Sequence, residues 1–233
     1  MTPAPLSPSP PILPPPAYAP PPGPLVLVYA DRDLVVIDKP SGLLSVPGRG
    51  EDLQDSAWRR VQVDFPTALA GHRLDMDTSG LLIFALRRKA EAALRAQFQQ
   101  HRVYKRYLAR VWGRVEAEEG WVEQPLSHDP LRPPLSRLDP LGRPARTCFQ
   151  VLSRAAASTR VALLPETGRS HQLRLHMQSL GHPILGDRFY ASGEALAAAP
   201  RLMLHAAALA FDHPYDGRRV ALEVGPDFAL DGP

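Results

Sequence analysis

Chemically active side chains gather in residues 71–80 (GHRLDMDTSG), which run directly into the apolar residues 81–86 (LLIFAL). The apolar run is short and continuous, which is typical of a buried strand. Glycines at both ends of the polar stretch allow a tight turn or a close approach of backbone to a ligand. A carboxylate such as Asp75, near the guanidinium of Arg73, stays ionised and oriented, as a nucleophile or general base requires. We therefore expect Arg73, Asp75 and Asp77 on a rigid loop at the rim of a core.

Two side chains farther along the chain are candidates to complete a site with Asp75. Tyr107 lies in residues 103–113, where apolar and basic residues alternate, which is typical of a strand with one apolar and one cationic face. A tyrosine on a cationic surface is a platform on which a nucleobase can stack. Arg174 is a fixed cation on a predicted helix. Taken singly, these three residues also fit a turn cap, core packing and a structural ion pair.

The composition is that of an ordinary globular protein, with 44% hydrophobic and 22% charged residues in a chain of 233. The net charge of +3 is a mild basic bias, compatible with a nucleic-acid partner but weak by itself. The single cysteine, Cys148, excludes an internal disulfide and a cysteine-rich metal site. Since no apolar run has the length of a membrane span and no signal peptide is visible, we expect a cytoplasmic protein.

Three histidines lie near one another in the sequence and raise the question of a metal site: His171, His176 and His182. A zinc pair on one helix usually has i, i+4 spacing, whereas His171 and His176 are five residues apart. The chain has no HExxH motif and no cysteine cluster. We therefore expect no metal.

The apolar patterning predicts strands interrupted by helices after a proline-rich tail. Residues 1–24 are half proline and cannot bury a core, so we expect a disordered extension there and one domain over residues 25–233. The predicted helices are residues 53–65, with Ser56 or Asp55 as the cap, 89–100, and 171–181, with Ser170 as the N-cap and Gly181 as the stop. The predicted strands are a hairpin over residues 25–38 and residues 81–86, 103–113, 147–152, 159–164, 201–206 and 219–224. Residues 116–144 are predicted to be rich in loops.

Four segments together resemble the pseudouridine synthases of the RluA family. They are residues 72–80 (HRLDMDTSG), 39–43 (KPSGL), 105–113 (KRYLARVWG) and 168–187, which begins with GRSHQLR and ends with GHPILGD. The likeness extends from about residue 25 to about residue 224, and the combination of motifs is highly specific. Further segments are similar to a family member that lacks an N-terminal S4 RNA-binding domain, so we expect no such domain here.

This resemblance implies both a fold and a reaction. The fold is α+β, with a mixed, mostly antiparallel bent sheet, flanking helices and a central basic cleft. The enzyme is an isomerase that flips a uridine out of RNA, breaks its glycosidic bond, turns the uracil and forms a C5–C1′ bond, without a cofactor or metal. Flipping is required because a stacked base hides its glycosidic carbon, and it costs roughly a few kcal/mol. The implied substrates are uridines in a 23S rRNA hairpin and in a tRNA anticodon stem-loop, bound by a monomer that needs neither DNA nor a membrane.

The resemblance also implies residue roles. Asp75 is the nucleophile, Tyr107 stacks on the flipped uracil, and Arg174 pairs with Asp75. Arg73 enters the stack that the uridine leaves, which offsets part of the flipping cost, and Leu204 closes the apolar side of the pocket. The other motif residues expected to bind substrate are His72, Lys105, Arg169 and Gln172. The basic residues expected to hold phosphates are Arg87, Arg88, Lys89, Arg95, Arg102, Lys105 and Arg106.

Three alternatives remain open from the sequence. The same chemistry could be confined to one class of RNA. A catalytically silent RNA-binding module is a second alternative, against which the intact set of Asp75, Tyr107 and Arg174 speaks. A hydrolase using Asp75 and a histidine would release free uracil, but no activating base is evident beside Asp75.

Overall fold

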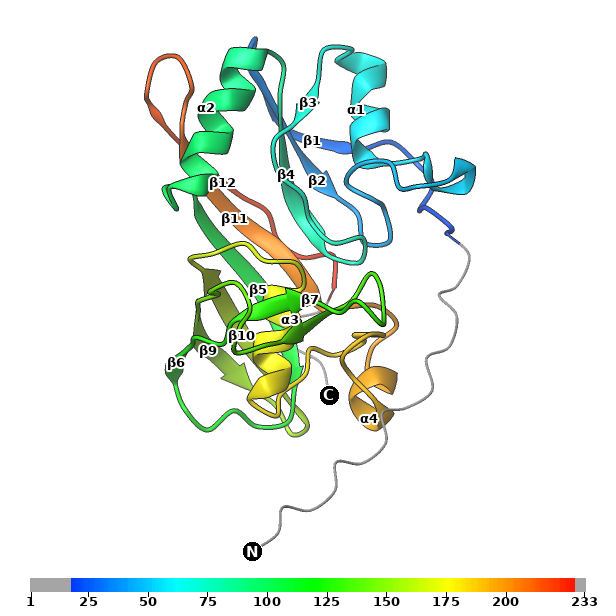
Figure 1. Cartoon of the computed structure of the whole chain (residues 1–233), viewed down its shortest axis with the longest axis vertical. Coiled ribbons are helices and arrows are strands. Elements are labelled where there is room, and N and C mark those ends of the chain that lie inside the picture. The colour runs from blue at the N-terminus through cyan, green and yellow to red at the C-terminus, as the bar shows by residue number, and fades with distance from the viewer. Residues whose placement is uncertain (1–17, 229–233) are drawn as a thin grey trace, which may run out of the picture.

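One mixed sheet of ten strands forms the frame of the protein, shown in Figure 1 as a computed structural model. The structure describes residues 18–228. The hydrogen-bonded order is β1-β2-β4-β11-β5-β10-β9-β6, with β3 on β4 and β12 on β11, while β7 and β8 form a separate hairpin. The strands are β1 (Val26–Ala30), β2 (Leu34–Lys39), β3 (Leu69–Ala70), β4 (Ser79–Ala85), β5 (Tyr104–Trp112), β6 (Glu119–Val122), β7 (Leu126–His128), β8 (Ser136–Leu138), β9 (Thr147–Arg154), β10 (Ser158–Pro165), β11 (Leu204–Asp212) and β12 (Arg219–Glu223). Within the described residues, all pairings are antiparallel except that of β4 with β11, so the expected α+β fold with a mostly antiparallel sheet is confirmed.

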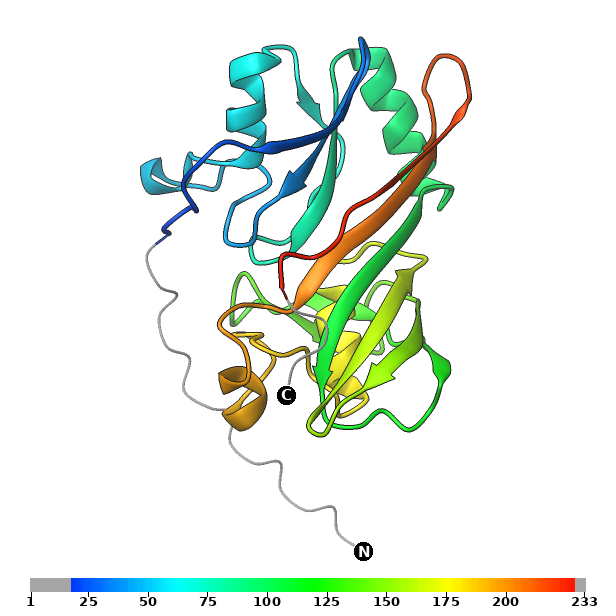
Figure 2. The same cartoon turned by 180° about the vertical axis from the view of Figure 1, so that it is seen from behind.

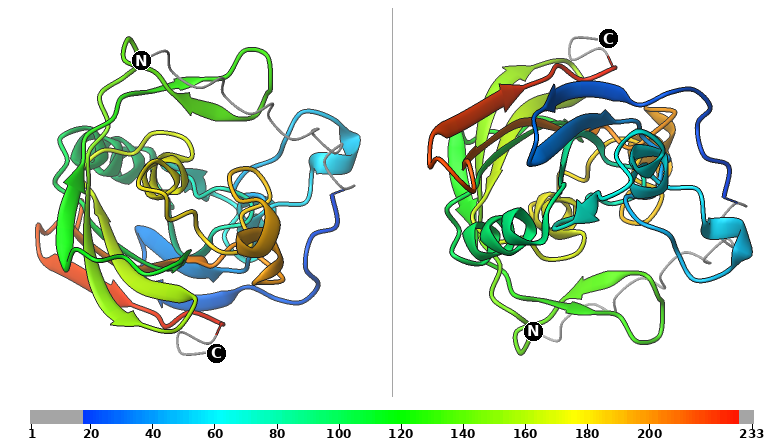
Figure 3. Two further views of the ribbon diagram at one scale, coloured as in Figure 1. Left: turned by 90° about the horizontal axis from the view of Figure 1, so that it is seen from below. Right: turned by 90° about the horizontal axis from the view of Figure 1, so that it is seen from above.

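Helices pack against this sheet, and alternate residues of β2 and β4 contact different helices. The helices are the 3-10 turn η1 (Glu51–Leu53), α1 (Ala57–Asp64), α2 (Arg88–Gln99), α3 (Gln172–Ser179) and α4 (Gly193–Ala197). Figure 3 shows α2 and α3 against one face of the sheet, with the β7–β8 hairpin beyond α3. In the described part of the chain, no helix is both long and apolar enough to cross a membrane.

Two helices close hydrophobic cores over the sheet. All seven residues of β4 are buried, and α2 covers this region with Ala90 and Leu94, spaced i, i+4 on one helix face. Farther along the sheet, α3 packs Leu173 and Met177 against β5, β9 and β10. The strand β4 and the helix α3 therefore belong to separate hydrophobic cores, which pack on the same sheet.

Gly80 is the point where these two parts of the sheet meet. It pairs with Ala206 in the short parallel contact between β4 and β11, and its φ of 109° is a conformation that side chains rarely adopt. A Cβ at this position would lie 2.6 Å from the backbone nitrogen of Ala206 and still closer to its carbonyl oxygen. The close approach requires a glycine, and Figure 2 shows the continuous sheet that results.

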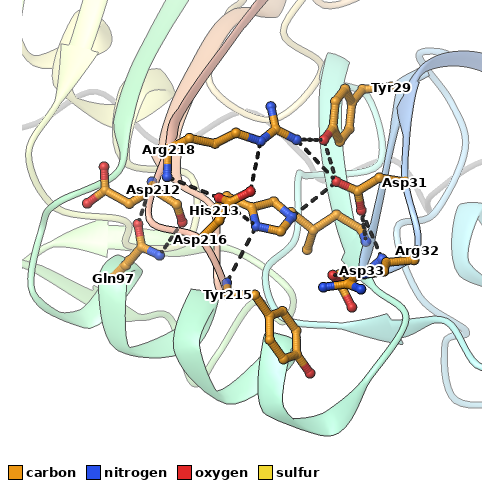
Figure 4. Close-up of polar contacts among 11 residues, drawn as sticks. Tyr29, Asp31, Arg32, Asp33, Gln97, Asp212, His213, Tyr215, Asp216 and Arg218 are labelled. Carbon is orange, nitrogen blue, oxygen red and sulfur yellow. Dashed lines mark hydrogen bonds and ion pairs between the residues drawn. The ribbon is translucent and has the colours of Figure 1, made fainter.

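A polar cluster fastens the β1–β2 turn to the β11–β12 turn (Figure 4). Asp31 Oδ1 accepts hydrogen bonds from the backbone of Asp33 and Leu34, both at 2.8 Å, and so closes its own turn. Asp31 Oδ2 lies 3.1 Å from His213 Nε2 and accepts the hydroxyl proton of Tyr29. These contacts join the β1–β2 turn to the β11–β12 turn.

Most predicted elements are present, and several differ from the prediction. The predicted helix over residues 53–65 begins later, because Ser56 caps α1 by accepting the N–H of Arg59 at 3.3 Å. The predicted strand over residues 201–206 is the start of β11, which begins at Leu204. The prediction of Ser170 as an N-cap is wrong, since His171 occupies that position. Short strands β6, β7 and β8 form inside residues 116–144.

The predicted tail reaches the folded part of the chain. Residues 1–17 lie outside the described residues, but the Tyr18 hydroxyl donates a hydrogen bond to the carbonyl of Asp55 at 2.8 Å and accepts one from the backbone of Leu44 at 3.1 Å. Arg60 of α1 donates to the carbonyls of Pro21 and Gly23. Residues 18–24 therefore contact the body of the protein.

Candidate active site

The loop that carries Asp75 is held by the segment that follows β2. Ser45 Oγ both donates to the carbonyl of Leu74, at 2.7 Å, and accepts its N–H, at 3.0 Å. Ser41 Oγ donates to the carbonyl of Asp77 at 2.7 Å, and the backbone carbonyl of Asp75 accepts the N–H of Thr78 across a turn at 3.2 Å. Because these contacts use backbone groups on both sides of Asp75, the loop is rigid, as the glycine-bounded sequence predicts.

Lys39, at the end of β2, completes this support from inside the protein. Its Nζ is fully buried and donates to the carbonyls of Met76, Leu43 and Pro40 at 2.7–2.9 Å. Burial lowers the pKa of Lys39 to about 7, although the nearby carboxylates of Asp77 and Asp75 favour its charged form. The ammonium group carries three donors on one atom, and all three are used here to join the loop to the strand.

Arg174, on the first turn of α3, reaches Asp75 from the other core. Its Nη1 lies 3.4 Å from Asp75 Oδ2, while its Nε and Nη2 donate to the two oxygens of Asp187 at 2.7 and 2.6 Å. Burial disfavours the guanidinium charge, but the Asp187 hydrogen bonds outweigh this and raise the pKa of Arg174. Arg174 is therefore a fixed cation beside a half-buried Asp75.

Tyr107 and Lys105 enter the site together because β5 alternates. Both line the pocket with Asp75, as the sequence pattern predicts for residues two apart on a strand. Burial raises the pKa of Tyr107, and the charge of Asp75 adds to this effect, so the phenol is neutral at pH 7. Lys105 Nζ donates to the carbonyl of Thr167 at 3.3 Å, and burial lowers its pKa to about 8.

These residues surround a pocket of about 530 Å³, within the usual size of a small-ligand site. Among the residues that line it, Asp75 is the one carboxylate. The lining cations are Arg73, Arg95, Lys105, Arg143, Arg169 and Arg174. A single carboxylate among several cations suits a polyanionic ligand whose phosphates bind around one reactive centre.

The predicted substrate-binding residues all line this pocket, in different ways. Arg73 is exposed and forms no hydrogen bond or ion pair with another described residue, whereas Leu204 is buried in the apolar wall. The ring of His72 stacks on Phe98, 4.6 Å between centroids, and its Nε2 accepts the N–H of Ile83 at 3.0 Å. Burial lowers the pKa of His72 to about 3, so it is a neutral part of the pocket wall.

Gln172 and Arg169 shape the loop before α3. Gln172 Oε1 accepts from the Thr167 hydroxyl and the Arg169 N–H, at 2.7 and 3.0 Å. Its Nε2 donates to the Arg146 carbonyl and the Thr147 hydroxyl, at 3.0 and 2.9 Å. Because its amide is fully used, Gln172 fixes the pocket wall. Arg169 Nε donates to a backbone carbonyl at 3.0 Å.

The predicted phosphate-binding cations divide into two groups. Arg95 and Lys105 line the pocket. Arg106, one residue from Lys105, points to the other face of β5 and pairs with Glu223. Arg87 pairs with buried Asp33 at 3.2 Å, and Arg102 with Asp212 at 2.6 Å. Arg88 and Lys89 are exposed at the start of α2. Arg143, in the segment predicted to be rich in loops, was not among the predicted phosphate-binding cations, but it lines the pocket.

One group of side chains in the described residues has ligand atoms close enough to share a metal ion: Asp31, Asp33 and His213. These residues lie in the cluster of Figure 4 and do not line the pocket. Their carboxylates are already paired with guanidinium groups, Asp33 with Arg32 at 3.0 Å and Asp31 with Arg218 at 3.5 Å. The donor set is therefore that of a structural ion-pair cluster. His171 and His176 bond to separate partners, Tyr190 and Thr147.

A model of the RNA pseudouridylate synthase family matches residues 33–179, more than half of the chain. The chain belongs to this family. The synthase is 52% identical to the dual-specificity RNA pseudouridine synthase RluA of Escherichia coli (strain K12) over 206 residues, which cover 88% of this chain and 94% of the relative. It is 49% identical to the protein of the same name from Vibrio vulnificus (strain CMCP6) over 211 residues, 88% of this chain and 84% of the relative.

A solved structure agrees with this assignment. Human RNA Pseudouridylate Synthase Domain Containing 1 is 28% identical to the synthase, with a TM-score of 0.74, over 94% of this chain and 89% of that one. The resemblance to the RluA family that the sequence motifs carry is thereby confirmed. The synthase is an isomerase that acts on RNA.

Two residues of this site could not be singled out from the sequence. Asp187 orients Arg174, and its signal in the sequence is its place at the end of the motif in residues 168–187, which gave it no role of its own. Lys39 was visible as part of a motif, but nothing in the sequence placed its ammonium group under the Asp75 loop. Both roles depend on contacts between distant parts of the chain.

Proposed function

We propose that this synthase converts uridine to pseudouridine in RNA with Asp75 as the catalytic nucleophile, and that it uses no cofactor or metal. The observation that carries the proposal is the position of Asp75, the one lining carboxylate of a cation-lined pocket, next to the buried guanidinium of Arg174. A carboxylate in that setting is ionised and faces the space into which a flipped nucleotide would enter.

The residues around Asp75 support the individual steps. Phosphates of the flipped nucleotide meet the lining cations, and the half-buried ring of Tyr107 offers a face on which the uracil stacks. The C1′–N1 bond breaks, the uracil turns in the pocket, and a C1′–C5 bond forms. The C5 proton is then lost and N1 takes up a proton, so the product is an isomer of the substrate. Leu204 supplies an apolar wall against which the freed uracil can turn.

Arg73 is suited to fill the gap in the RNA stack. It is exposed at the pocket and uncommitted to any described partner, so its planar guanidinium is available to stack between bases. This contact would offset part of the cost of flipping. The variant Arg73→Ala would then weaken binding of stem-loop RNA more than binding of unstructured RNA.

Tritium release from RNA labelled at C5 of uridine tests the catalytic assignment. We expect Asp75→Asn to release no tritium above background. The matched control is Asp77→Asn, since Asp77 belongs to the same loop but does not line the pocket and pairs with Arg188 at 2.9 Å. Full activity of Asp75→Asn would show that Asp75 is not the nucleophile. Release of free uracil by the wild type would indicate a hydrolase.

For the substrates, we propose uridines in both a 23S rRNA hairpin and a tRNA anticodon stem-loop. Support comes from the two relatives described above, whose names include dual specificity. Pseudouridine mapping of both RNAs in a deletion strain would show two lost positions. Loss of a single position would restrict the enzyme to one class of RNA.

We further propose that residues 25–233 act as one catalytic unit, as a monomer in the cytoplasm. Asp75, Tyr107 and Arg174 meet in one pocket, and no residue of a second copy is needed to bring them together. Light scattering of the purified protein during gel filtration should give the mass of one chain, about 25.6 kDa.

A further inference from the structure

His171 lies directly before α3 and has a positive φ angle. Its φ is 57° and its ψ is 17°, the left-handed region, which is uncommon for residues other than glycine and in which asparagine, aspartate and histidine are the most frequent of these. Such a conformation persists where the surrounding structure holds it, often at functional sites. His171 is only 8% exposed and lines the pocket beside Asp75.

Two oxygen atoms flank the imidazole of His171. Its Nδ1 lies 2.6 Å from the hydroxyl of Tyr190, and its Nε2 lies 3.9 Å from Asp75 Oδ2. The Tyr190 oxygen accepts the N–H of Ser136 at 3.0 Å, and its proton has two acceptors within reach, His171 Nδ1 at 2.6 Å and the Ser136 carbonyl at 3.1 Å. The shorter contact favours donation to Nδ1. A neutral ring must then carry its proton on Nε2, on the side that faces Asp75.

The charges around the ring are arranged to keep it neutral. Burial lowers the pKa of His171, and the guanidinium groups of Arg174 and Arg73 act in the same direction, whereas Asp75 and Asp187 oppose them. Burial also raises the pKa of Tyr190 to about 12, so its hydroxyl keeps its proton at pH 7. The Tyr190 hydroxyl is therefore a donor within reach of His171 Nδ1, as it is of the Ser136 carbonyl.

One carboxylate positions both partners of Asp75. Asp187 holds Arg174 through two hydrogen bonds and also accepts the backbone N–H groups of Phe189 and Tyr190, at 2.9 and 3.2 Å. The rings of Phe189 and Tyr190 enclose the imidazole, with centroids 5.8 and 5.5 Å away. Rotation of the His171 ring is therefore blocked on two sides.

We propose that His171 is a positioning residue for Asp75, with Tyr190 fixing the tautomer that directs Nε2–H to the carboxylate. The inference rests on the proposed function. When a uridine fills the pocket, the 3.9 Å separation shortens to a hydrogen bond, since catalytic contacts are often long before the substrate binds. Arg174 and His171 then hold Oδ2 between them, and Oδ1 is left free to react. Because Tyr190 bonds to Ser136, the β7–β8 hairpin also takes part in aligning the carboxylate.

Single-turnover tritium release, RNA binding and nitrogen NMR together test this role. His171→Asn removes the imidazole and keeps a residue that tolerates a positive φ. We expect its rate constant to fall 10- to 100-fold while the Kd for RNA changes less than threefold. Tyr190→Phe should lower the rate constant about three- to tenfold. The control is His182→Asn, since His182 bonds to the Trp112 carbonyl at 2.9 Å outside the pocket, and it should leave the rate unchanged.

The NMR measurement separates positioning from simple structural support. In ¹⁵N-histidine-labelled protein, His171 should show a protonated Nε2 and an unprotonated Nδ1, and Tyr190→Phe should mix the two tautomers. A protonated Nδ1 in the wild type, or a full rate for His171→Asn, would overturn the inference. If either of these results were found while Asp75→Asn is inactive in the same assay, only the proposed role of His171 would be wrong. If Asp75→Asn is active, the proposed function itself is lost.

Discussion

Arg174 makes its shortest hydrogen bonds with Asp187, at 2.6 and 2.7 Å, and reaches Asp75 only at 3.4 Å. The nearer carboxylate is fully buried, whereas the Asp75 side chain is 23% exposed. Asp187 thus accepts two hydrogen bonds from the guanidinium of Arg174 and fixes its plane. Asp75 is attracted by the positive charge of Arg174, but it does not form the same pair of short hydrogen bonds. This arrangement leaves the reactive carboxylate accessible to a substrate.

Replacing Asp187 by Asn should therefore damage both stability and catalysis. The buried guanidinium would lose its charged partner, and breaking a buried ion pair costs about 3–5 kcal/mol. We expect the free energy of unfolding to fall by about 3 kcal/mol, at the lower end of that range, because the amide retains one oxygen acceptor. The single-turnover rate should fall at least tenfold, since Arg174 would no longer be held toward Asp75. Urea denaturation and tritium release measure the two effects.

A second ion pair near the site provides the control for this prediction. Asp77 and Arg188 are partly exposed and 2.9 Å apart, so Asp77→Asn should cost no more than about 1 kcal/mol. Equal losses of stability in the Asp187 and Asp77 variants would show that Asp187 has no special role in holding Arg174.

Local patterns explain which parts of the site the sequence could predict. The alternation along β5 places Lys105 and Tyr107 on one face, and the structure brings both to the pocket with Asp75. The same alternation sends Arg106 to the opposite face, where it pairs with Glu223, although a count of basic residues assigned it to the phosphates. A periodic rule therefore succeeded where composition alone failed.

The rest of the site depends on contacts that no local pattern contains. Lys39 bonds to the carbonyl of Met76, 37 residues away, and Arg174 meets Asp75 across 99 residues. His171 takes the N-cap position of α3 in a left-handed conformation, although the more usual N-cap residue Ser170 directly precedes it. Such features arise only when separate elements are assembled.

The junction between β4 and β11 should tolerate no side chain at Gly80. A Cβ there would overlap the backbone of Ala206, and the φ of 109° adds strain. We expect Gly80→Ala to lower the free energy of unfolding by about 3 kcal/mol or more, or to prevent accumulation of folded protein. Gly71→Ala is the control, since a Cβ at Gly71 would meet no atom within 4 Å. Thermal denaturation and soluble yield compare the two, and equal stability would contradict the close approach of these strands.

RNA binding should weaken as Lys105 loses its proton. Burial lowers its pKa to about 8, so the positive charge is present below that pH and is lost as the pH rises through it. An RNA phosphate would favour the charged form, and a hydrogen bond to a charged group contributes about 1.5–3 kcal/mol. We expect wild type to bind RNA about tenfold more tightly than Lys105→Met at pH 6.5, with the two affinities converging by pH 9.5.

Fluorescence anisotropy at constant ionic strength measures this effect, with both proteins carrying Asp75→Asn to prevent turnover. Lys89→Met is the comparison, because Lys89 is exposed at the start of α2. Removal of that lysine should leave the pH dependence in place. If the ratio of the Kd values of wild type and Lys105→Met were the same at all pH values, the charge of Lys105 would not contribute to phosphate binding.

Lys39 should make the stability of the fold depend on pH. Burial lowers its pKa from the ordinary lysine value of 10.5, which the unfolded chain retains, to about 7. Between these two values the unfolded chain therefore holds a proton that the folded chain has released. The free energy of unfolding must rise with pH across this window, by at most about 1.4 kcal/mol per pH unit. Below pH 7 both states are protonated, and the contribution becomes constant.

The variant Lys39→Met should lose this slope together with the hydrogen bonds that hold the Asp75 loop. Urea denaturation at pH 6.5, 8 and 9.5 should show the wild type gaining stability relative to Lys39→Met at each step, because other titrating groups cancel in the difference. Lys89→Met, which alters an exposed lysine, should follow the wild type throughout. If Lys39→Met also follows the wild type, the Lys39 ammonium keeps its proton at high pH, and its bonds to the loop carbonyls outweigh the cost of burying its charge.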